Sequence, residues 1–171
     1  MSNRNIILVG FMGTGKTTVG KLLARKLDME FLDMDRVIEE RQQRNISAIF
    51  AEEGEQLFRS LERALVHELA ARQGLVIAAG GGVVLNADNV ADYSRTGLVV
   101  CLTAAPEAIL KRVSRTSHRP LLEGDEKLKR IREIMEKRQA LYAAIPQQVD
   151  TTHLAPQAVA EIILRMYPDP R

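Results

Sequence analysis

The sequence predicts one α/β domain, residues 1–171, in which helices flank a five-stranded, mainly parallel sheet to form three layers. Short apolar runs alternate with longer amphipathic segments along the chain, which is typical of βαβ units. The first apolar run, IILV at residues 6–9, is continuous, as expected for a strand that helices cover on both faces. A chain of 171 residues is large enough to bury a core and small enough to form one domain.

Two kinds of pattern predict the individual elements. Apolar runs such as LVIAA and LVVCL predict buried strands, and the sequence around Val149 predicts a weaker one. A leucine at every fourth position from 57 to 69 gives the longest helix a buried face. Residues 114–125 lack apolar periodicity and mix Ser, Thr, Gly and Pro with charge, so we expect a mobile loop there. In chain order the expected elements are a strand at 5–9, a helix at 16–27, a strand at 30–32, helices at 35–44 and 55–73, strands at 75–79 and 98–102, helices at 107–115 and 126–144, a strand near 149 and a helix at 156–167.

Composition argues against several classes of function. No apolar run approaches the ~20 residues of a membrane span and no secretory segment precedes the first strand, so we expect a cytoplasmic protein with no membrane partner. Cys101 is the single cysteine, which excludes an internal disulfide and suggests a buried, inert thiol. Residues 111–138 hold ten basic and five acidic side chains, a block that suits nucleic acid, an anionic small molecule or solvated helices. Aromatic residues are only 4% and Trp is absent, so we expect no nucleic-acid partner.

A phosphate-binding loop follows the first strand. Residues 10–17 read GFMGTGKT and match G-x-x-x-x-G-K-[ST] at every position, between an expected strand and an expected helix. The glycines let backbone N–H groups surround phosphate oxygens, and the helix directs its positive end at the same oxygens. Lys16 is suited to the β- and γ-phosphates, and the Thr17 hydroxyl to Mg²⁺. The loop predicts a nucleoside triphosphate, but it leaves kinases, GTPases, ATPases and nucleotide-binding regulators open.

Two carboxylates follow the second expected strand. Asp33 and Asp35 then fall at the carboxyl edge of the sheet, where the phosphate loop also lies. Residues two apart on a strand share a face, so both side chains are expected to point into one cleft. One carboxylate near Mg²⁺ and another near an acceptor hydroxyl suit phosphoryl transfer. The alternative for Asp35 is an N-cap of the helix that begins at Arg36.

Two further motifs suit an anionic ligand. Arg59 and Glu62 are three residues apart on a helix, so the carboxylate can hold the guanidinium as a clamp for a ligand carboxylate. The alternative is an ordinary surface ion pair. The triple glycine at residues 80–82 follows a strand at the same sheet edge, where it suits either close approach of a small ligand or a flexible turn.

Together these motifs resemble those of the shikimate kinases, small phosphate-loop enzymes of the nucleoside monophosphate kinase-like group. The resemblance runs from Ile6 to about Met166, and it rests on the order and spacing of the motifs. They are GFMGTGKTTVG, FLDMD, GExxFRxxE, the triple glycine, the segment Arg119-Pro120-Leu121-Leu122, and Arg138 four residues before Tyr142.

The resemblance implies that ATP, with Mg²⁺, phosphorylates the 3-hydroxyl of shikimate to give shikimate 3-phosphate, in the pathway to chorismate and aromatic amino acids. It implies catalytic roles for Lys16, Asp35 and Arg119, with Arg119 in a lid that closes over the nucleotide. Thr17 and Asp33 would serve the metal, Asp33 through water. The implied nucleotide-binding residues are Gly13, Thr14, Gly15, Lys16, Thr17, Thr18, Arg112 and Arg119, with Arg112 against the adenine.

The resemblance also implies an acceptor site, with a substrate-binding helical part at about 35–62. Asp35 would orient the 3-hydroxyl, while Arg59 and Arg138 would bind the shikimate carboxylate and Glu62 would brace Arg59. The implied substrate-binding residues are Asp35, Arg59, Gly80, Gly81, Gly82 and Arg138, with apolar walls from Phe50, Phe58, Pro120 and Leu121.

One departure from the family pattern lies near the C-terminus. Many shikimate kinases have an Arg near the adenine after the Val-Asp-Thr run, where this chain has Thr152, His153 and Leu154. The contact to the adenine therefore stays open, with His153 either stacking there or lying in an exposed loop. The alternatives to a shikimate kinase are another small-molecule kinase, such as a gluconate kinase, and a non-catalytic nucleotide-binding regulator. We expect a monomer whose partners are shikimate and ATP.

Overall fold

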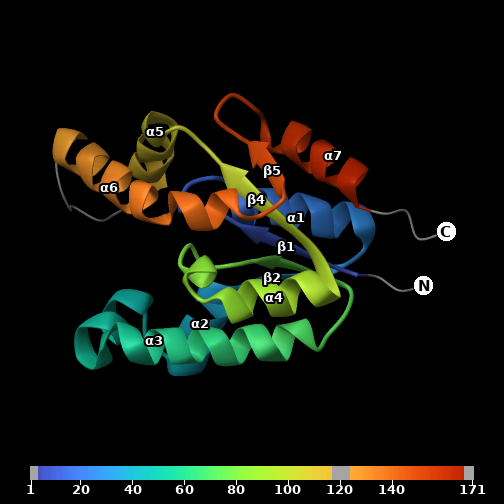
Figure 1. The fold of residues 1–171 in the computed structure, drawn as a ribbon, viewed down its shortest axis with the longest axis horizontal. Helices are drawn as coiled ribbons and strands as arrows, with labels where there is room; N and C mark the ends of the chain where they lie inside the picture. Colours follow the sequence, from blue (N-terminus) through green and yellow to red (C-terminus); the bar gives the residue numbers. More distant parts are fainter. Residues whose placement is uncertain (1–3, 117–123, 168–171) are drawn as a thin grey trace.

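The architecture is seen in a computed structural model that describes residues 4–116 and 124–167. Its five strands form one sheet in the order β2-β3-β1-β4-β5, and every neighbouring pair is parallel (Figure 1). The predicted α/β class is confirmed, and the sheet is wholly rather than mainly parallel. The strands are β1 (Asn5–Val9), β2 (Glu30–Asp33), β3 (Leu75–Ala78), β4 (Gly97–Thr103) and β5 (Gln147–Asp150).

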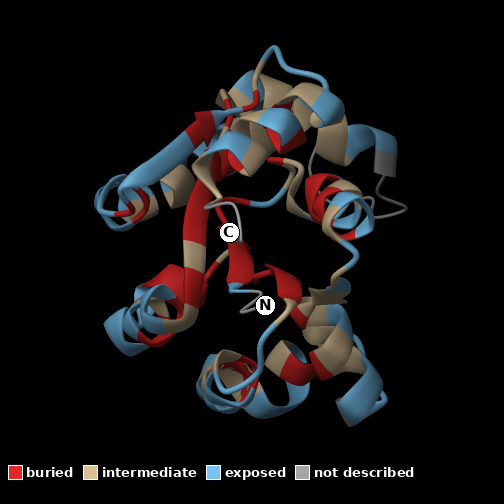
Figure 2. Cartoon of the chain, turned by 90° about the vertical axis from the view of Figure 1, so that its right-hand side faces the viewer, coloured by how far each residue is buried: buried red, intermediate tan, exposed pale blue. Residues whose placement is uncertain are grey.

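Helices connect the strands and cover both faces of the sheet. In β1, Ile7 and Val9 point into one apolar cluster, which also takes in residues of α2 to α6. Ile6 and Leu8 point into a second cluster with residues of α1 and α7. Figure 2 shows these buried residues in the sheet and on the helix faces turned toward it. The helices are α1 (Lys16–Leu27), α2 (Met34–Gln42), α3 (Ile46–Ala70), the 3₁₀ turn η1 (Val83–Leu85), α4 (Ala87–Thr96), α5 (Pro106–Thr116), α6 (Gly124–Ala143) and α7 (Pro156–Met166).

Most predicted elements lie within a few residues of the observed ones, but α4 was not predicted. Its sequence is mostly polar, so it lacks an apolar pattern strong enough to read. The helix is fixed instead by its N-cap, where the Asn86 side chain accepts from the Asp88 backbone N–H, and by the fully buried Tyr93. Tertiary packing, rather than local periodicity, therefore accounts for this helix.

The prediction for α3 was also too short. The helix begins at Ile46, after an N-cap in which the Asn45 side chain accepts from the Ala48 backbone N–H. Gly54 interrupts it with a positive φ of 81°, so the chain kinks there and the part before the kink was read as irregular. The residues that face the cavity described below come from both parts.

The structure describes only the two ends of the segment 114–125, where a lid is expected. Residues 114–116 continue α5, and residues 124–125 begin α6. The stretch between them, which contains Arg119, Pro120 and Leu121, lies outside the described residues. Within the part of the chain that the structure describes, no helix is long and apolar enough to cross a membrane.

Candidate active site

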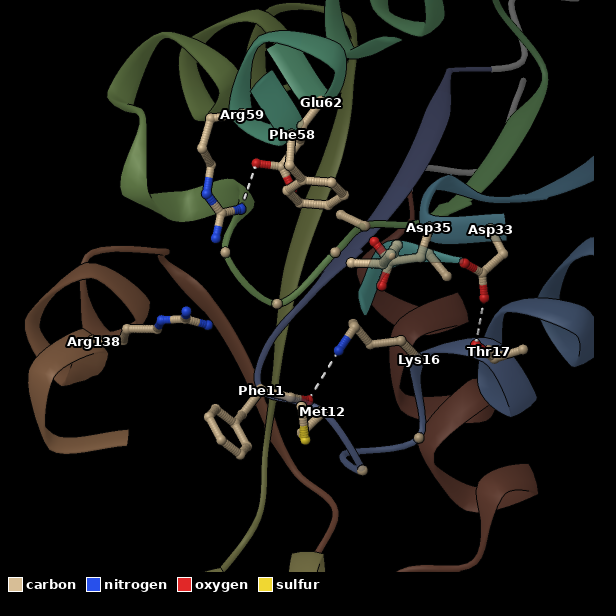
Figure 3. Close-up of a pocket in the computed structure, with 18 of the residues that line it drawn as sticks. Phe11, Met12, Lys16, Thr17, Asp33, Asp35, Phe58, Arg59, Glu62 and Arg138 are labelled. Atoms are coloured by element: carbon tan, nitrogen blue, oxygen red, sulfur yellow. Dashed lines mark hydrogen bonds and ion pairs between the residues drawn. The ribbon is translucent and has the colours of Figure 1, made fainter. Parts of the chain in front are cut away.

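A cavity of about 430 Å³ opens at the carboxyl edge of the sheet, between the phosphate loop, α2, α3, the triple glycine and α6. Parallel strands bring their carboxyl ends to one edge, so segments far apart in sequence meet there. Figure 3 shows Arg59 and Arg138 on one side, Thr17 and Asp33 on the other, and Lys16 with Asp35 between them. The predicted site residues that line the cavity are Gly13, Gly15, Lys16, Thr17, Thr18, Asp33, Asp35, Arg59, Gly80, Gly81, Gly82 and Arg138.

The phosphate loop is held in shape by its backbone. Gly10 has a φ of 138°, and a Cβ there would overlap the carbonyl of Leu102 on β4, so only glycine fits. The buried Thr14 hydroxyl donates to the Phe11 carbonyl across the loop at 2.7 Å. The loop then enters α1 directly, with its first helical residue at Lys16. The N–H groups at this helix start are the ones that suit phosphate oxygens.

Lys16 lies at the centre of the cavity and folds back onto its own loop. Its ammonium donates to the carbonyl oxygens of Gly10 and Phe11, at 2.7 and 2.9 Å. Burial lowers the pKa of Lys16 to about 8, although Asp35 and Asp33 nearby favour the charged form. The charged form of Lys16 therefore predominates at neutral pH, and its population falls above about pH 8.

The Thr17 hydroxyl and the Asp33 carboxylate lie together at one side of the cavity. The Thr17 hydroxyl donates to Asp33 Oδ2 at 2.9 Å. Asp33 Oδ1 accepts from the Arg36 backbone N–H, so Asp33 is the N-cap of α2 and the capping role considered for Asp35 is wrong. Asp35 lies in the first turn of α2, so helix geometry rather than strand alternation brings it into the cavity.

These two oxygens fit a shared magnesium ion. Mg²⁺ prefers hard oxygen ligands, and it commonly takes only one or two from the protein and the rest from phosphates and water. Among the described residues, no group of three or more His, Cys, Asp or Glu side chains is placed to hold a metal ion. A hydroxyl and a carboxylate beside a phosphate loop therefore suit a metal that arrives with a nucleotide.

Asp35 is half-buried in the middle of the cavity. Burial, and then repulsion from Asp33, raise the pKa of Asp35 above its ordinary value, while Lys16 partly opposes the rise. A Cβ on Gly80 would lie only 2.8 Å from Asp35 Oδ1. The glycine is therefore needed for this carboxylate to reach its position. The close approach of a small ligand at the triple glycine stays a prediction.

Arg59 is held by carboxylates on its own helix. Its guanidinium donates to Glu62 Oε1 at 2.9 Å and to Glu55 Oε1 at 3.2 Å. The Glu62 side chain is 2% exposed, so the pair is not the surface ion pair considered from the sequence. Burial raises the pKa of Glu62, and Arg59 opposes the rise. A Cβ on Gly82 would overlap the Arg59 guanidinium, so the turn and the arginine pack directly.

Arg138 approaches from the opposite element, α6. A Cβ on Gly81 would lie 3.6 Å from Arg138 Nη1, so this guanidinium also lies beside the triple glycine. Phe58 and Phe50, with ring centroids 4.9 Å apart, line the same end of the cavity as predicted apolar walls. Two guanidinium groups beside the triple glycine make this end suitable for a carboxylate ligand.

A second cavity, of about 570 Å³, lies on the other side of the phosphate loop. Arg112 lines it and donates to the carbonyl oxygens of Gly13, at 3.1 Å, and Thr151, at 2.6 Å. Leu154 also lines it, while the His153 side chain is exposed. Thr14, which is absent from the lining of the first cavity, lines this one.

Sequence reasoning missed Thr151 and Tyr142 as supports of the site. The buried Thr151 hydroxyl donates to the Thr14 carbonyl at 2.9 Å, which ties the end of β5 to the phosphate loop. The Tyr142 hydroxyl donates to the Gly81 carbonyl at 2.5 Å. Both residues lie in motifs quoted from the sequence, but no local pattern reveals these contacts, because each partner is a backbone oxygen more than 60 residues away.

Comparisons with known proteins give one consistent family. A family model described as "Shikimate kinase" matches residues 12–168. The shikimate kinase of Desulforudis audaxviator is 48% identical over 161 residues, which cover 94% of this chain and 85% of the relative. That of Thermodesulfovibrio yellowstonii is 43% identical over 164 residues, 96% of this chain and 95% of the relative.

Solved structures agree with the sequence comparisons. The Acinetobacter baumannii shikimate kinase in complex with shikimate has a TM-score of 0.87 and 39% identity, covering 96% of this chain and 92% of its own. A gluconokinase from Sinorhizobium meliloti has a TM-score of 0.61 at 14% identity, over 95% of this chain and 90% of its own. The second likeness reflects the fold alone, so it does not favour the gluconate kinase alternative.

Proposed function

The chain belongs to the shikimate kinase family, and from this premise we infer that it transfers the γ-phosphoryl group of ATP to the 3-hydroxyl of shikimate. One observation carries the residue-level proposal: a phosphate loop, a carboxylate and two arginines line a single cavity. A non-catalytic regulator of this ancestry would be expected to have lost the lysine or the carboxylates of the site. Lys16, Asp33 and Asp35 are all present here.

We assign the donor end to the phosphate loop. Backbone N–H groups of residues 13–18 hold the phosphate oxygens, and the Lys16 ammonium exchanges its bonds to the Gly10 and Phe11 carbonyls for bonds to the transferring group. Negative charge on that group shifts during transfer, so a fixed cation there lowers the barrier. The adenine is proposed to bind in the second cavity, beside Arg112.

Asp35 orients and deprotonates the acceptor. Its carboxylate accepts the hydrogen bond of the shikimate 3-hydroxyl, whose oxygen then attacks the γ-phosphorus in line with the leaving ADP oxygen. The oxygen–phosphorus bond to ADP breaks, and the hydroxyl proton passes to Asp35. A carboxylate whose pKa is raised by burial is a better base for this proton than an ordinary aspartate.

Arg59 and Arg138 bind the carboxylate of shikimate at the other end of the cavity. The hydrogen bonds from Arg59 to Glu62 and Glu55 fix the guanidinium before substrate arrives, which reduces the entropy lost on binding. Gly80 and Gly82 carry no side chain, so Asp35 and Arg59 can pack against this turn and face the acceptor. The carboxylate position then sets which hydroxyl reaches Asp35.

Thr17 and Asp33 would hold Mg²⁺, which would supply positive charge to offset that of the ATP phosphates. The pair is already arranged by its hydrogen bond and by the cap that Asp33 makes on α2. The role of Arg119 in a lid stays a prediction, because this residue lies outside the described part of the chain. The monomeric state, the absence of a nucleic-acid partner and the cytoplasmic location stay predictions too.

A coupled assay of ADP release tests the function. With ATP, Mg²⁺ and shikimate we expect ADP at a rate far above that without shikimate, and a phosphorylated product whose ³¹P–¹H coupling places the phosphate on the 3-oxygen. Gluconate in place of shikimate is the control acceptor and should give background only. ADP release with gluconate but not with shikimate, from protein that binds ATP, would refute the proposal.

A further inference from the structure

Tyr142 is a buried tyrosine that the proposed reaction does not use. Its side chain is 8% exposed, and its hydroxyl donates to the Gly81 carbonyl at 2.5 Å, within the normal range for a short O–H···O hydrogen bond. Tyr142 belongs to α6, whereas Gly81 follows β3, 61 residues earlier. The bond therefore joins two separate elements that both face the acceptor end of the cavity.

The end of α6 that carries Tyr142 is itself fixed to the sheet. Gln148 on β5 donates from its amide nitrogen to the carbonyl oxygens of Tyr142, at 2.6 Å, and Ile145, at 2.9 Å. The amide thus binds one carbonyl in the last turn of α6 and one just beyond its end. The backbone of Tyr142 is therefore hydrogen-bonded to β5, and its side chain is hydrogen-bonded to the turn at Gly81.

Arg138 depends on the same anchor. It lies four residues before Tyr142 on α6, so the two side chains share one face of the helix. Both approach Gly81, the hydroxyl at its carbonyl oxygen and the guanidinium near its Cα. Burial raises the pKa of the Tyr142 phenol while the nearby Arg138 guanidinium opposes the rise, so the hydroxyl stays protonated and donates at neutral pH.

We propose that Tyr142 is a positioning residue for the acceptor: its bond to the Gly81 carbonyl sets the separation between the triple glycine and Arg138. This inference rests on the proposed function, because it takes Arg138 and residues 80–82 as the site of the shikimate carboxylate. Tyr142 touches no reacting atom. It acts by holding two binding elements at a distance that one carboxylate can bridge.

The test is Tyr142→Phe, which removes only the hydroxyl. We expect the KM for shikimate to rise about three- to tenfold, as for the loss of one hydrogen bond, and the KM for ATP to change less than about twofold. Tyr167→Phe is the matched control, because the Tyr167 hydroxyl also donates to a backbone carbonyl, that of Arg4, at 2.6 Å and away from the cavity. It should change neither KM.

A double variant separates positioning from general stability. If Tyr142 acts through Arg138, the shikimate KM of the double variant Tyr142→Phe/Arg138→Lys should exceed that of Arg138→Lys alone by less than about twofold. Calorimetric titration of shikimate gives the same comparison, since its stoichiometry counts only folded protein. Equal rises in both KM values, or fully additive effects, would overturn the inference. If Arg138→Lys leaves shikimate binding unchanged, the proposed shikimate site is wrong. If Arg138→Lys weakens shikimate binding but Tyr142→Phe leaves it unchanged, the site stands and the inference about Tyr142 fails.

Discussion

The two ends of the cavity are built in different ways. The nucleotide end comes from one continuous stretch, residues 10–18, and Lys16 is held there by carbonyl oxygens of the same loop. The acceptor end is assembled from α2, α3, the turn after β3 and α6, and Arg59 is held there by carboxylate side chains. The proposed phosphate site is therefore built mainly from one local loop, which Thr151 supports from the end of β5, whereas the proposed acceptor site draws on several separate elements.

The largest expected effect lies where the two ends meet, at Lys16. Lys16→Met removes the cation aimed at the transferring group, so kcat should fall by about a thousandfold or more. Steady-state ADP release measures this, with Lys21→Met on the same helix as the control. A Lys16→Met enzyme within tenfold of the parent rate, roughly 1.4 kcal/mol, would show that the lysine is not part of the chemistry.

Asp35→Asn should have the next largest effect. It keeps the size and a hydrogen-bonding oxygen but removes the base, so kcat should fall by about a hundredfold while both KM values change little. Asp88→Asn is a matched control, because Asp88 also lies in the first turn of a helix, α4. Unlike Asp35, it is exposed and does not line the cavity. A fall confined to the KM for shikimate would make Asp35 a binding residue only.

Arg59→Lys sharpens the comparison between the ends, since it should affect one ligand alone. The lysine keeps a charge beside the buried Glu62 but loses the planar fork that suits a carboxylate, so the KM for shikimate should rise about thirtyfold and that for ATP less than twofold. Arg63→Lys, one turn later on α3 and paired with Asp92 instead, is the control. Equal rises for both ligands would make Arg59 a structural residue.

The smallest effect expected is in the pH profile. Lys16 must be protonated, and its pKa is about 8, so kcat/KM for ATP should fall about tenfold per unit as pH rises beyond that value. Asp35 must be ionised and its pKa is raised, so activity should also fall on acidification, at a pH above the usual range for an aspartate. Initial rates at saturating shikimate test both limbs. An alkaline limb near pH 10, the ordinary lysine value, would contradict the buried setting of Lys16.

The difference between the two ends of the cavity also decided which features could be predicted from the sequence. The phosphate loop was readable because its function needs particular residues at fixed short spacing, from Gly10 to Thr17. Strands β1, β3 and β4 were readable because both their faces are buried, and the second part of α3 because of its leucines. Helix α4 was not, since its polar residues carry no periodicity and one buried tyrosine fixes it.

The parts of the acceptor end were predicted from the residues, but their assignment to one site for shikimate came only from the resemblance to a family. Arg59, Asp35 and Arg138 each have an ordinary structural explanation when taken alone, and only the fold brings them into one cavity. Reasoning from spacing considered Asp35 as the cap of α2, whereas the cap is Asp33. The sequence did not show whether the helix begins at Met34 or at Arg36, and the position of the cap depends on that boundary. Tyr142 and Thr151 act on distant carbonyl oxygens, which no local pattern reveals.

A crystal structure of the enzyme with ADP, Mg²⁺ and shikimate tests the central claim most directly. The account predicts the β-phosphate in the loop at residues 13–18, the shikimate carboxylate between Arg59 and Arg138, and the 3-hydroxyl within hydrogen-bond distance of Asp35. Shikimate bound outside this cavity, or turned so that its carboxylate faces Lys16 and another hydroxyl faces Asp35, would contradict it.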